Sequence, residues 1–156
     1  ASKTARIELR AALDRWLVGH AAHAQAMRRA RTFVWHTGDR RVVADFSLAA
    51  HVVVRADLPR RVGRGSPDAF LRSFSLASPW TARSTAAGSG ELLWDALSRA
   101  VAAAEIAAAR VVVVDAINSS AAAFYEHHGF VGVPNNANRL VQKISDIGAT
   151  LAPAGP

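Results

Sequence analysis

A short glycine-containing turn in the middle of the chain has the composition of a loop that can hold phosphates. Residues 81–90 read TARSTAAGSG and lead directly into the amphipathic pattern ELLWDALSRA. Backbone N–H groups and the positive end of the helix dipole attract anions to the start of a helix. Such turns are common before helices, so this turn alone does not identify a ligand.

The chain carries a large excess of arginine. Of its 156 residues, 19 are Lys or Arg and 12 are Asp or Glu, which gives a formal net charge of +7; 17 of the 19 cations are Arg. Because guanidinium groups bind phosphate in a bidentate way, one interpretation is a polyanionic ligand or substrate. The alternative is a bias toward GC-rich codons, which raises the content of Arg and Ala without any functional meaning.

Composition excludes several other classes of chemistry. The chain has no cysteine, so it has neither disulfides nor a thiol nucleophile, and its six histidines show no metal-ligand spacing, so no metal is expected. The charged N-terminal segment lacks a signal-peptide core, and no apolar stretch approaches the roughly 20 residues of a membrane helix. We therefore expect a cytoplasmic protein with no membrane partner, with one globular domain at residues 1–150 and a flexible tail at 151–156.

The hydrophobic pattern predicts the elements that must position these residues. In chain order they are a helical pattern over 7–30 with a break at Gly19, strands at 32–36 and 41–50 joined as a hairpin, a possible extension at 51–58, a basic loop at 59–68, an amphipathic helix at 91–108, a buried strand at 111–116, a helix at 119–128 ended by Gly129, a strand at 139–144 that closes the sheet, and a loose end from 149. This order predicts a single α/β domain with a mixed, mostly antiparallel sheet flanked by helices.

The most specific pattern follows the buried strand and reads NSSAAAFYEHHGF. It resembles the signature Asn-x-x-Ala-x-x-Phe-Tyr-x-x-x-Gly-Phe of the GNAT-type N-acetyltransferases. The matching residues are Asn118, Ala121, Phe124, Tyr125, Gly129 and Phe130. The resemblance implies a GNAT-like domain that uses acetyl-CoA as co-substrate.

The resemblance also implies roles for individual residues. Asn118 would cap the helix, Ala121 would leave room for the cofactor arm, and both would contact acetyl-CoA together with Phe124. Tyr125 would protonate the departing CoA sulfur as general acid, while the substrate amine attacks a thioester carbonyl held by backbone N–H donors. The alternative for Tyr125 is a core aromatic ring whose hydroxyl reaches the surface. No general base stands out; the side chains with suitable chemistry are His36, His51, His127 and His128.

Further segments resemble a narrower group, the GNAT toxins encoded beside ribbon–helix–helix antitoxins. These segments are LDRWL (13–17), ARTFV (30–34), VVADFSLA (42–49), ELLWDAL (91–97) and RLVQKI (139–144). Such toxins acetylate the free α-amine of aminoacyl-tRNA and block translation, so the resemblance implies aminoacyl-tRNA as substrate, an antitoxin as partner and a homodimer as one assembly. It also gives the arginine excess a purpose, the binding of tRNA phosphates by Arg28, Arg29, Arg31, Arg60, Arg61 and Arg64.

The cofactor loop departs from that family, in which the pyrophosphate loop reads Gln/Arg-x-x-Gly-x-Gly/Ala after an apolar strand. Two alignments of this chain are open. One gives Arg83, Ala86 and Gly88 as candidates for CoA binding, and the other gives Ser84, Ala87 and Ser89; Gly90 is a further candidate because glycine permits close backbone approach. The preceding segment carries Arg72, three serines and Pro79 where an apolar strand is expected. One hypothesis is a reading-frame slip over Ala69–Gly90 between two compensating indels, because GC-rich codons of the other frame spell an apolar strand and the loop His-Gly-Arg-Gly-Leu-Gly.

Asp45 is a second departure, since it lies in an otherwise apolar strand. A buried carboxylate without a partner costs several kcal/mol or takes up a proton.

Three functions are open at this point. The first is a tRNA-acetylating toxin; the second is a GNAT enzyme that acetylates a small amine or a protein; the third is an inactive remnant that binds an antitoxin or nucleic acid. Comparing acetylation of aminoacyl-tRNA with acetylation of free amines distinguishes the first two functions. Absence of CoA binding, with antitoxin or tRNA binding retained, indicates the third.

Overall fold

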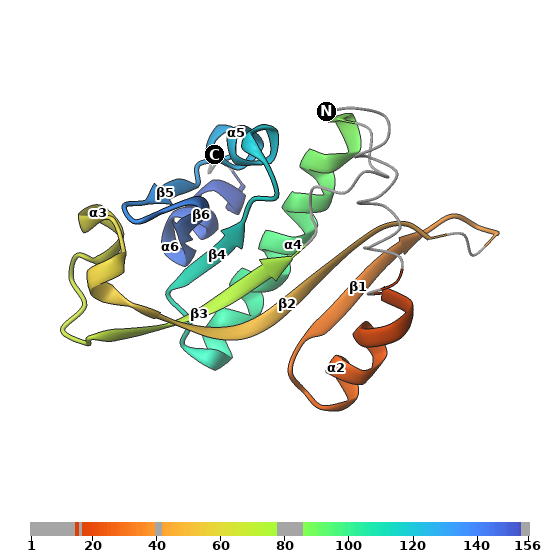
Figure 1. Cartoon of the computed structure of the whole chain (residues 1–156), viewed down its shortest axis with the longest axis horizontal. Coiled ribbons are helices and arrows are strands. Elements are labelled where there is room, and N and C mark those ends of the chain that lie inside the picture. The colour runs from red at the N-terminus through yellow and green to blue at the C-terminus, as the bar shows by residue number, and fades with distance from the viewer. Residues whose placement is uncertain (1–14, 16, 40–41, 78–85, 154–156) are drawn as a thin grey trace. The chain divides into compact units, whose positions relative to one another are not determined.

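The computed structural model describes residue 15 and residues 17–39, 42–77 and 86–153. Figure 1 labels its α-helices and β-strands. The elements are η1 (Leu17–Ala21, a π-helical turn), α2 (Ala22–Ala26), β1 (Arg31–His36), β2 (Val42–Val54), η2 (Arg55–Asp57, a 3-10 turn), α3 (Arg60–Gly63), β3 (Phe70–Ala77), α4 (Ala86–Ala107), β4 (Val111–Asp115), α5 (Ser119–His127), β5 (Val131–Val133), β6 (Asn136–Lys143) and α6 (Ile144–Leu151). None of the helices within these ranges is long and apolar enough to span a membrane.

The strands follow the order β1-β2-β3-β4-β6-β5. β3 and β4 run parallel, whereas β1 pairs with β2, β4 with β6 and β5 with β6 in antiparallel fashion. The predicted mixed, mostly antiparallel sheet is confirmed. The chain divides into two compact units, one of residues 1–49 and 77–96 and the other of residues 50–76 and 97–156.

The hairpin of the first unit is held by cross-strand pairs. The rings of Phe33 and Phe46 stack with centroids 5.0 Å apart, and the hydroxyls of Thr32 and Ser47 are 2.7 Å apart. The indole N–H of Trp35 donates to Asp95 Oδ2 at 2.9 Å, which ties the hairpin to α4. Aromatic and hydroxyl pairs of this kind fix the register of an antiparallel pair.

The predicted break at Gly19 is wrong, and the helical pattern predicted up to residue 30 is too long. The π-helical turn η1 continues directly into α2, which ends at Ala26. An alanine side chain at Gly19 would meet nothing within 4 Å, so this glycine lowers helix propensity without forcing an end. The chain leaves the helix at Arg28, whose φ of 55° is in the left-handed region.

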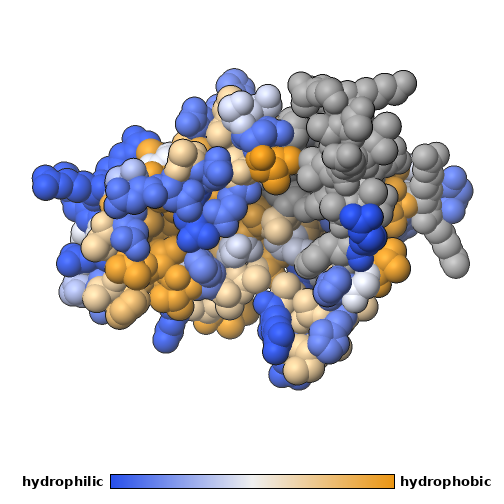
Figure 2. Space-filling model, in the orientation of Figure 1, coloured by the Kyte–Doolittle hydropathy of each residue, from blue (hydrophilic) through white to orange (hydrophobic). Residues whose placement is uncertain are grey.

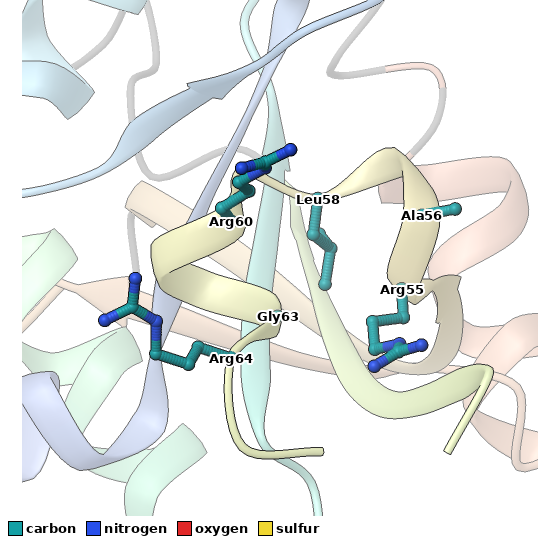
Figure 3. A pocket seen from close by; sticks show the side chains of 6 residues that line it. All are labelled: Arg55, Ala56, Leu58, Arg60, Gly63 and Arg64. Carbon is teal, nitrogen blue, oxygen red and sulfur yellow. The ribbon is translucent and has the colours of Figure 1, made fainter. Parts of the chain in front are cut away.

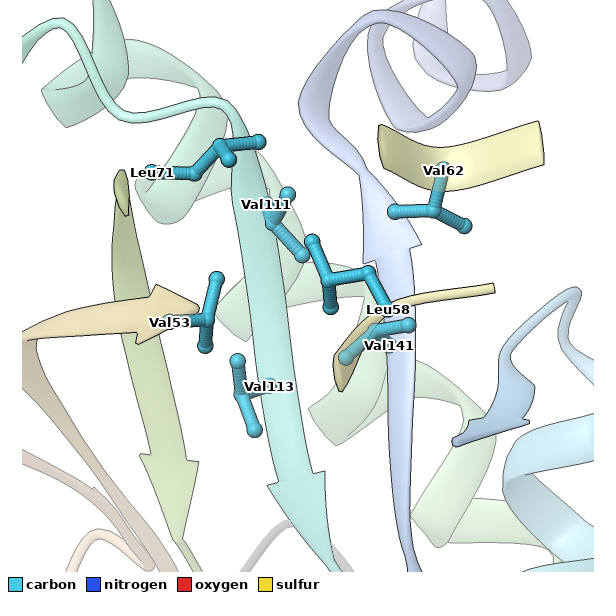
Figure 4. Packing of buried hydrophobic residues seen from close by; sticks show 7 residues of the cluster. All are labelled: Val53, Leu58, Val62, Leu71, Val111, Val113 and Val141. Atoms are coloured by element: carbon cyan, nitrogen blue, oxygen red, sulfur yellow. The ribbon is translucent and has the colours of Figure 1, made fainter. Parts of the chain in front are cut away.

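The core of the second unit is built around β4 (Figure 4). Its four valines are at most 1% exposed, which confirms the prediction of a central strand covered on both faces. One face of the sheet contributes to a cluster of Val53, Leu58, Val62, Leu71, Val111, Val113 and Val141. Leu58 and Val62 come from the segment between β2 and β3, so this segment is anchored to the sheet.

Three predictions for the second unit need correction. The basic loop contains a helical turn, α3, because burial of Val62 favours a turn that points this side chain into the core. The strand at 139–144 does not close the sheet, since the three-residue β5 forms the edge and was too short to show a pattern. The loose end predicted from residue 149 is helical as far as Leu151, because α6 buries Ile147 to 2% exposure.

The unusual segment before the predicted cofactor loop forms a strand. β3 pairs in parallel with β4 from Ser73↔Val111 to Leu76↔Val114. Leu71 and Leu76 are buried, whereas Arg72 is exposed. Ser73 is also buried, and its hydroxyl has no hydrogen-bond partner among the residues that the structure describes. The serines therefore do not prevent a strand, although one of them leaves a buried polar group unsatisfied.

Candidate active site

The turn between β4 and α5 is fixed by the side chain of Asn118. This residue has extended backbone angles, and its Oδ1 accepts a hydrogen bond from Ala121 N at 2.8 Å. An acceptor at this position satisfies one of the free N–H groups of the first helical turn. The predicted N-cap is confirmed, and the amide nitrogen of Asn118 is left to face other partners.

A bidentate ion pair closes the same end of β4. Arg139 donates from Nε to Asp115 Oδ1 at 2.8 Å and from Nη2 to Asp115 Oδ2 at 2.9 Å, between two residues that are paired in the β4–β6 ladder. The hydrogen bond to Asp115 raises the pKa of Arg139, which keeps the guanidinium charged. Sequence reasoning missed this pair; the available signal was a carboxylate directly after four buried valines.

Tyr125 lies on the buried face of α5, one turn after Ala121, and is 4% exposed. Its ring makes edge contacts with Phe124 at 5.4 Å and with Phe130 at 5.5 Å between centroids. Burial raises the pKa of its hydroxyl well above the usual value near 10. Within the described part of the chain the hydroxyl has no hydrogen-bond partner. Tyr125 is thus a protonated phenol in an aromatic setting at neutral pH.

The end of α5 keeps the aromatic residues in place. His128 Nδ1 donates to Phe124 O at 2.8 Å, and the rings of these two residues are 4.6 Å apart. Gly129 then ends the helix with a φ of 94°, as predicted. The positive φ favours glycine, and a side chain there would place Cβ 2.8 Å from Gln142 Nε2, so the Gln142 side chain would have to shift. The hydrogen bond to Phe124 occupies one ring nitrogen of His128.

The predicted cofactor stretch is divided by the start of α4. Arg83 and Ser84 lie outside the described residues, whereas α4 begins at Ala86 and not at residue 91 as predicted. The residues from Ala86 to Gly90 are therefore helical rather than part of a turn; Gly88 and Gly90 are half-buried and Ser89 is buried. Glycine in these first turns leaves backbone uncovered, which suits close approach of a ligand.

The predicted phosphate-binding arginines form two sets. Arg28, Arg29 and Arg31 are exposed in the first unit, where the Arg31 guanidinium lies 5.7 Å from the Phe33 ring centroid. The second set, Arg60, Arg61 and Arg64, is exposed on and directly after α3. Figure 2 shows hydrophilic side chains gathered over the end of the second unit that carries α3.

Among the described residues, no three His, Asp or Glu side chains come together as a metal site would require.

A parallel strand pair within a mixed sheet, followed by a capped helix that buries a tyrosine, defines a GNAT-like domain. Two solved structures share this fold. AtaT complexed with acetyl-methionyl-tRNAfMet has a TM-score of 0.78 and 22% identity, with 90% of this chain and 86% of that chain covered. A mutant AtaT toxin bound to the C-terminus of the antitoxin AtaR and acetyl-CoA has a TM-score of 0.70 and 18% identity, with 91% and 85% covered.

A sequence relative gives the family. A tRNA-acetylating toxin of Mycobacterium tuberculosis (strain ATCC 25618 / H37Rv) is 33% identical over 141 residues, which cover 89% of this chain and 84% of the relative. No protein-family model matches the chain. The chain belongs to the family of GNAT-type tRNA-acetylating toxins.

Proposed function

We propose that this protein is an acetyl-CoA-dependent N-acetyltransferase toxin that acetylates the α-amine of aminoacyl-tRNA and so blocks translation. The observation that carries the proposal is the β4–α5 segment, where Asn118 caps the helix and a buried Tyr125 follows at the spacing of the family signature. The family relationship supports the same reaction, because the sequence relative is a tRNA-acetylating toxin.

The residues at hand suit acetyl-CoA as co-substrate. The Nδ2 group of Asn118 is left free by the cap, and Ala121 adds little bulk to the first turn of α5. These two residues and Phe124 would contact the cofactor arm. For the cofactor phosphates the candidates stay Arg83, Ser84, Ala86, Ala87, Gly88, Ser89 and Gly90. Acetyl-CoA supplies an activated thioester. A mutant AtaT binds acetyl-CoA, and this supports the assignment.

Tyr125 would act as the proton donor. The substrate amine would attack the thioester carbonyl, the carbon–sulfur bond would break, and the phenolic proton would go to the sulfur. The proton lost by the amine nitrogen would pass, directly or through solvent, to the phenolate, which restores the phenol. The raised pKa of Tyr125 keeps this proton in place until the sulfur develops negative charge. The aromatic contacts with Phe124 and Phe130 restrict rotation of the Tyr125 side chain, so its hydroxyl keeps one position.

The partners follow from the same relationship. AtaT is bound to an antitoxin in one solved structure and to acetyl-methionyl-tRNA in another. We propose an antitoxin of the ribbon–helix–helix type, action in the cytoplasm and contact of the six predicted arginines with tRNA phosphates. We also propose a homodimer, which sedimentation of the purified protein would detect as twice the mass of one chain.

The test is an acetylation assay with purified protein, radiolabelled acetyl-CoA and two acceptors. The acceptors are a pool of aminoacyl-tRNA and a panel of free amino acids and small amines at equal concentration. The proposal is supported if the label appears on the aminoacyl-tRNA and leaves the tRNA, as acetylated amino acid, when the aminoacyl ester bond is hydrolysed. Label on the small amines alone would overturn it in favour of a small-amine acetyltransferase.

A further inference from the structure

A cavity of about 200 Å³, which we call the Gln142 cavity, lies where α3, the turn after α5, β6 and α6 come together. Its polar lining consists of Arg61 from α3, Gln142 and Lys143 from β6, and Asp146 from α6. Gln142 is 9% exposed, whereas Lys143 is half-buried and Arg61 and Asp146 are exposed. The cavity therefore combines a buried amide with charges of both signs near its opening.

The amide of Gln142 contains an acceptor without a partner. Its Oε1 atom is buried and accepts no hydrogen bond from any residue that the structure describes. A buried polar atom in this state is unfavourable unless a water molecule or a ligand supplies the missing donor. Gly129 also lines the cavity and keeps the space beside the amide open, since a Cβ there would lie 2.8 Å from Gln142 Nε2. The missing donor can therefore come from a molecule in the cavity.

The charged groups of the lining are also unpaired within the described part of the chain. No ion pair joins Asp146 to Arg61 or to Lys143. The carboxylate of Asp146 accepts only a long hydrogen bond from the hydroxyl of Ser145, at 3.4 Å. The opening of the cavity can therefore receive a negative group and a positive group at the same time.

The core holds the walls of the cavity in place. Val62 and Val141, which belong to the same core cluster, are the chain neighbours of Arg61 and Gln142 (Figure 4). Ile147 anchors α6 beside the cavity, because its side chain is only 2% exposed. The polar side chains therefore extend from backbone that is fixed by packing on three elements.

A larger cavity of about 360 Å³ beside α3 lacks these properties (Figure 3). The guanidinium groups of Arg55, Arg60 and Arg64, which line it, point away from one another. Arg55 Nη1 already donates to Ser66 O at 3.0 Å. No residue that lines it has a buried, unpartnered polar side-chain atom among the described residues. The Gln142 cavity is therefore the one whose lining requires a further hydrogen-bond donor.

We propose that the Gln142 cavity binds a small α-amino acid in its zwitterionic form. The ammonium group donates to Gln142 Oε1 and to Asp146, and the carboxylate accepts from Arg61 and Lys143. A simple carboxylate has no donor for Gln142, whereas a simple amine leaves two cations without a counter-charge. A zwitterion meets both requirements in one molecule.

The volume of the cavity suits a ligand of this size. A water molecule takes about 30 Å³, so the cavity has room for about six groups of that size. A single bridging water could satisfy Gln142 Oε1, but it would leave most of the cavity and its charges without a partner. Drug-sized ligands occupy about 300 Å³ or more, so the cavity favours an amino acid with a short side chain.

The Gln142 cavity is separate from the site of the proposed acetyl transfer. Gln142 and Lys143 pair with Val112 and Val111 at the start of β4, whereas Asn118 follows the end of this strand. The rise of about 3.3 Å per residue puts about 13 Å between the two ends of β4. An amino acid in the cavity is thus not the acceptor of the acetyl group, and the inference does not rest on the proposed function.

The experiment measures binding of glycine, L-alanine, L-serine and L-valine to the purified chain, without acetyl-CoA or tRNA. Isothermal titration calorimetry gives Kd for each ligand up to about 10 mM, and thermal melting gives the shift in melting temperature. L-alaninamide, which lacks the carboxylate, and N-acetyl-L-alanine, which lacks the ammonium group, are the matched control ligands.

The test variants are Gln142→Leu and Asp146→Asn. The control variant Glu126→Gln removes an exposed carboxylate of the same unit that does not line the cavity. Melting in ligand-free buffer verifies that each variant folds. Gln142→Leu should remain folded, because it removes an unsatisfied buried acceptor and keeps a side chain of similar size.

We expect at least one of the four amino acids to raise the melting temperature of the parent by several degrees near saturation. Each test variant should bind that amino acid at least about ten-fold more weakly, the usual effect of losing a hydrogen bond to a charged group. The control variant should stay within about two-fold of the parent. Both control ligands should bind at least about ten-fold more weakly than L-alanine.

Absence of binding by all four amino acids would overturn the proposal and assign the cavity to water. Equal binding of L-alaninamide or N-acetyl-L-alanine would overturn the zwitterion as the ligand. Undiminished binding by both test variants would place the amino acid at another site of the chain and overturn the assignment to this cavity. Since no acetyl group is transferred in these assays, failure of the proposed acetylation would leave their outcome unchanged.

Discussion

At the scale of single residues, two buried ionisable side chains matter most. Tyr125 is a phenol among aromatic rings, and Asp45 is a carboxyl group that is 3% exposed within β2. Burial raises the pKa of both groups, because it disfavours the charged form. For Tyr125 this preserves a proton that the proposed reaction uses, whereas for Asp45 it lowers stability wherever the carboxyl is ionised.

Tyr125→Phe should lower kcat for acetylation by about 10²–10⁴-fold, the usual contribution of a general acid. KM for aminoacyl-tRNA should change little, because the ring and its contacts with Phe124 and Phe130 remain. The measurement is steady-state kinetics together with a thermal melt. A variant with full activity would show that Tyr125 is only a core aromatic residue.

Asp45→Asn should alter how stability depends on pH. Burial raises the folded-state pKa of Asp45 above its usual value of 3.8, so between these two values the native state binds more protons than the unfolded state. Stability of the parent therefore falls as pH rises through this window, and the variant lacks this component. In urea unfolding, the free energy of unfolding of the variant relative to that of the parent should be higher at pH 7 than at pH 4. The opposite trend would mean that the native structure favours the ionised carboxyl.

At the scale of elements, the site depends on where α5 starts and stops. Asn118 fixes the first turn, and Gly129 reverses the backbone so that Phe130 can return to contact Tyr125. The ion pair of Asp115 with Arg139 holds the preceding strand end to β6. The position of the tyrosine is therefore set by a cap, a glycine and a salt bridge that surround it.

Gly129→Ala should destabilise the protein by about 1–3 kcal/mol. The new side chain would have to adopt a φ of 94° and would collide with Gln142, which has to move. Gly132→Ala is the control, because a Cβ there meets nothing within 4 Å, and its change should stay near 0.5 kcal/mol or less. Denaturant unfolding compares the two variants. Equal stability of both would show that the turn after α5 relaxes freely.

At the scale of the whole molecule, the affinity for acetyl-CoA depends on the unusual stretch of residues 69–90. β3 forms despite Arg72 and its serines, and α4 begins at Ala86, so the elements on both sides of residues 78–85 are present. Backbone donors rather than side chains dominate phosphate binding at a helix start, and such donors survive substitution. The reading-frame hypothesis for residues 69–90 stays a prediction, to be decided by the nucleotide sequence.

Acetyl-CoA at about 100 times its Kd should stabilise the protein by about 2.7 kcal/mol. For a chain of this length the melting temperature then rises by several degrees. A thermal-melt titration with ATP as the control ligand measures this. Cooperative melting without any shift would contradict the enzyme and favour an inactive remnant that retains its basic surfaces.

The sequence alone determined the local features. The valine run predicted a buried central strand, the Asn-to-Gly spacing predicted α5 with its cap and stop, and the six signature positions pointed to the GNAT class. These features depend on residues close together in the chain and on the periodicity of apolar residues, and both can be read from the sequence. Elements too short for a period, such as β5 and α3, could not be predicted in this way.

Only the tertiary structure decided which distant residues act together. It paired Asp115 with Arg139, placed Phe130 against Tyr125 and put Gln142 where Gly129 must leave space. It also placed Arg55 beside the cavity that Arg60 and Arg64 line, and Arg61 beside another cavity. Burial, electrostatic neighbours and free donors depend on contacts between residues far apart in the chain. Residue types and their spacing therefore indicate which functional groups a chain can use, whereas tertiary packing decides which of these groups come into contact.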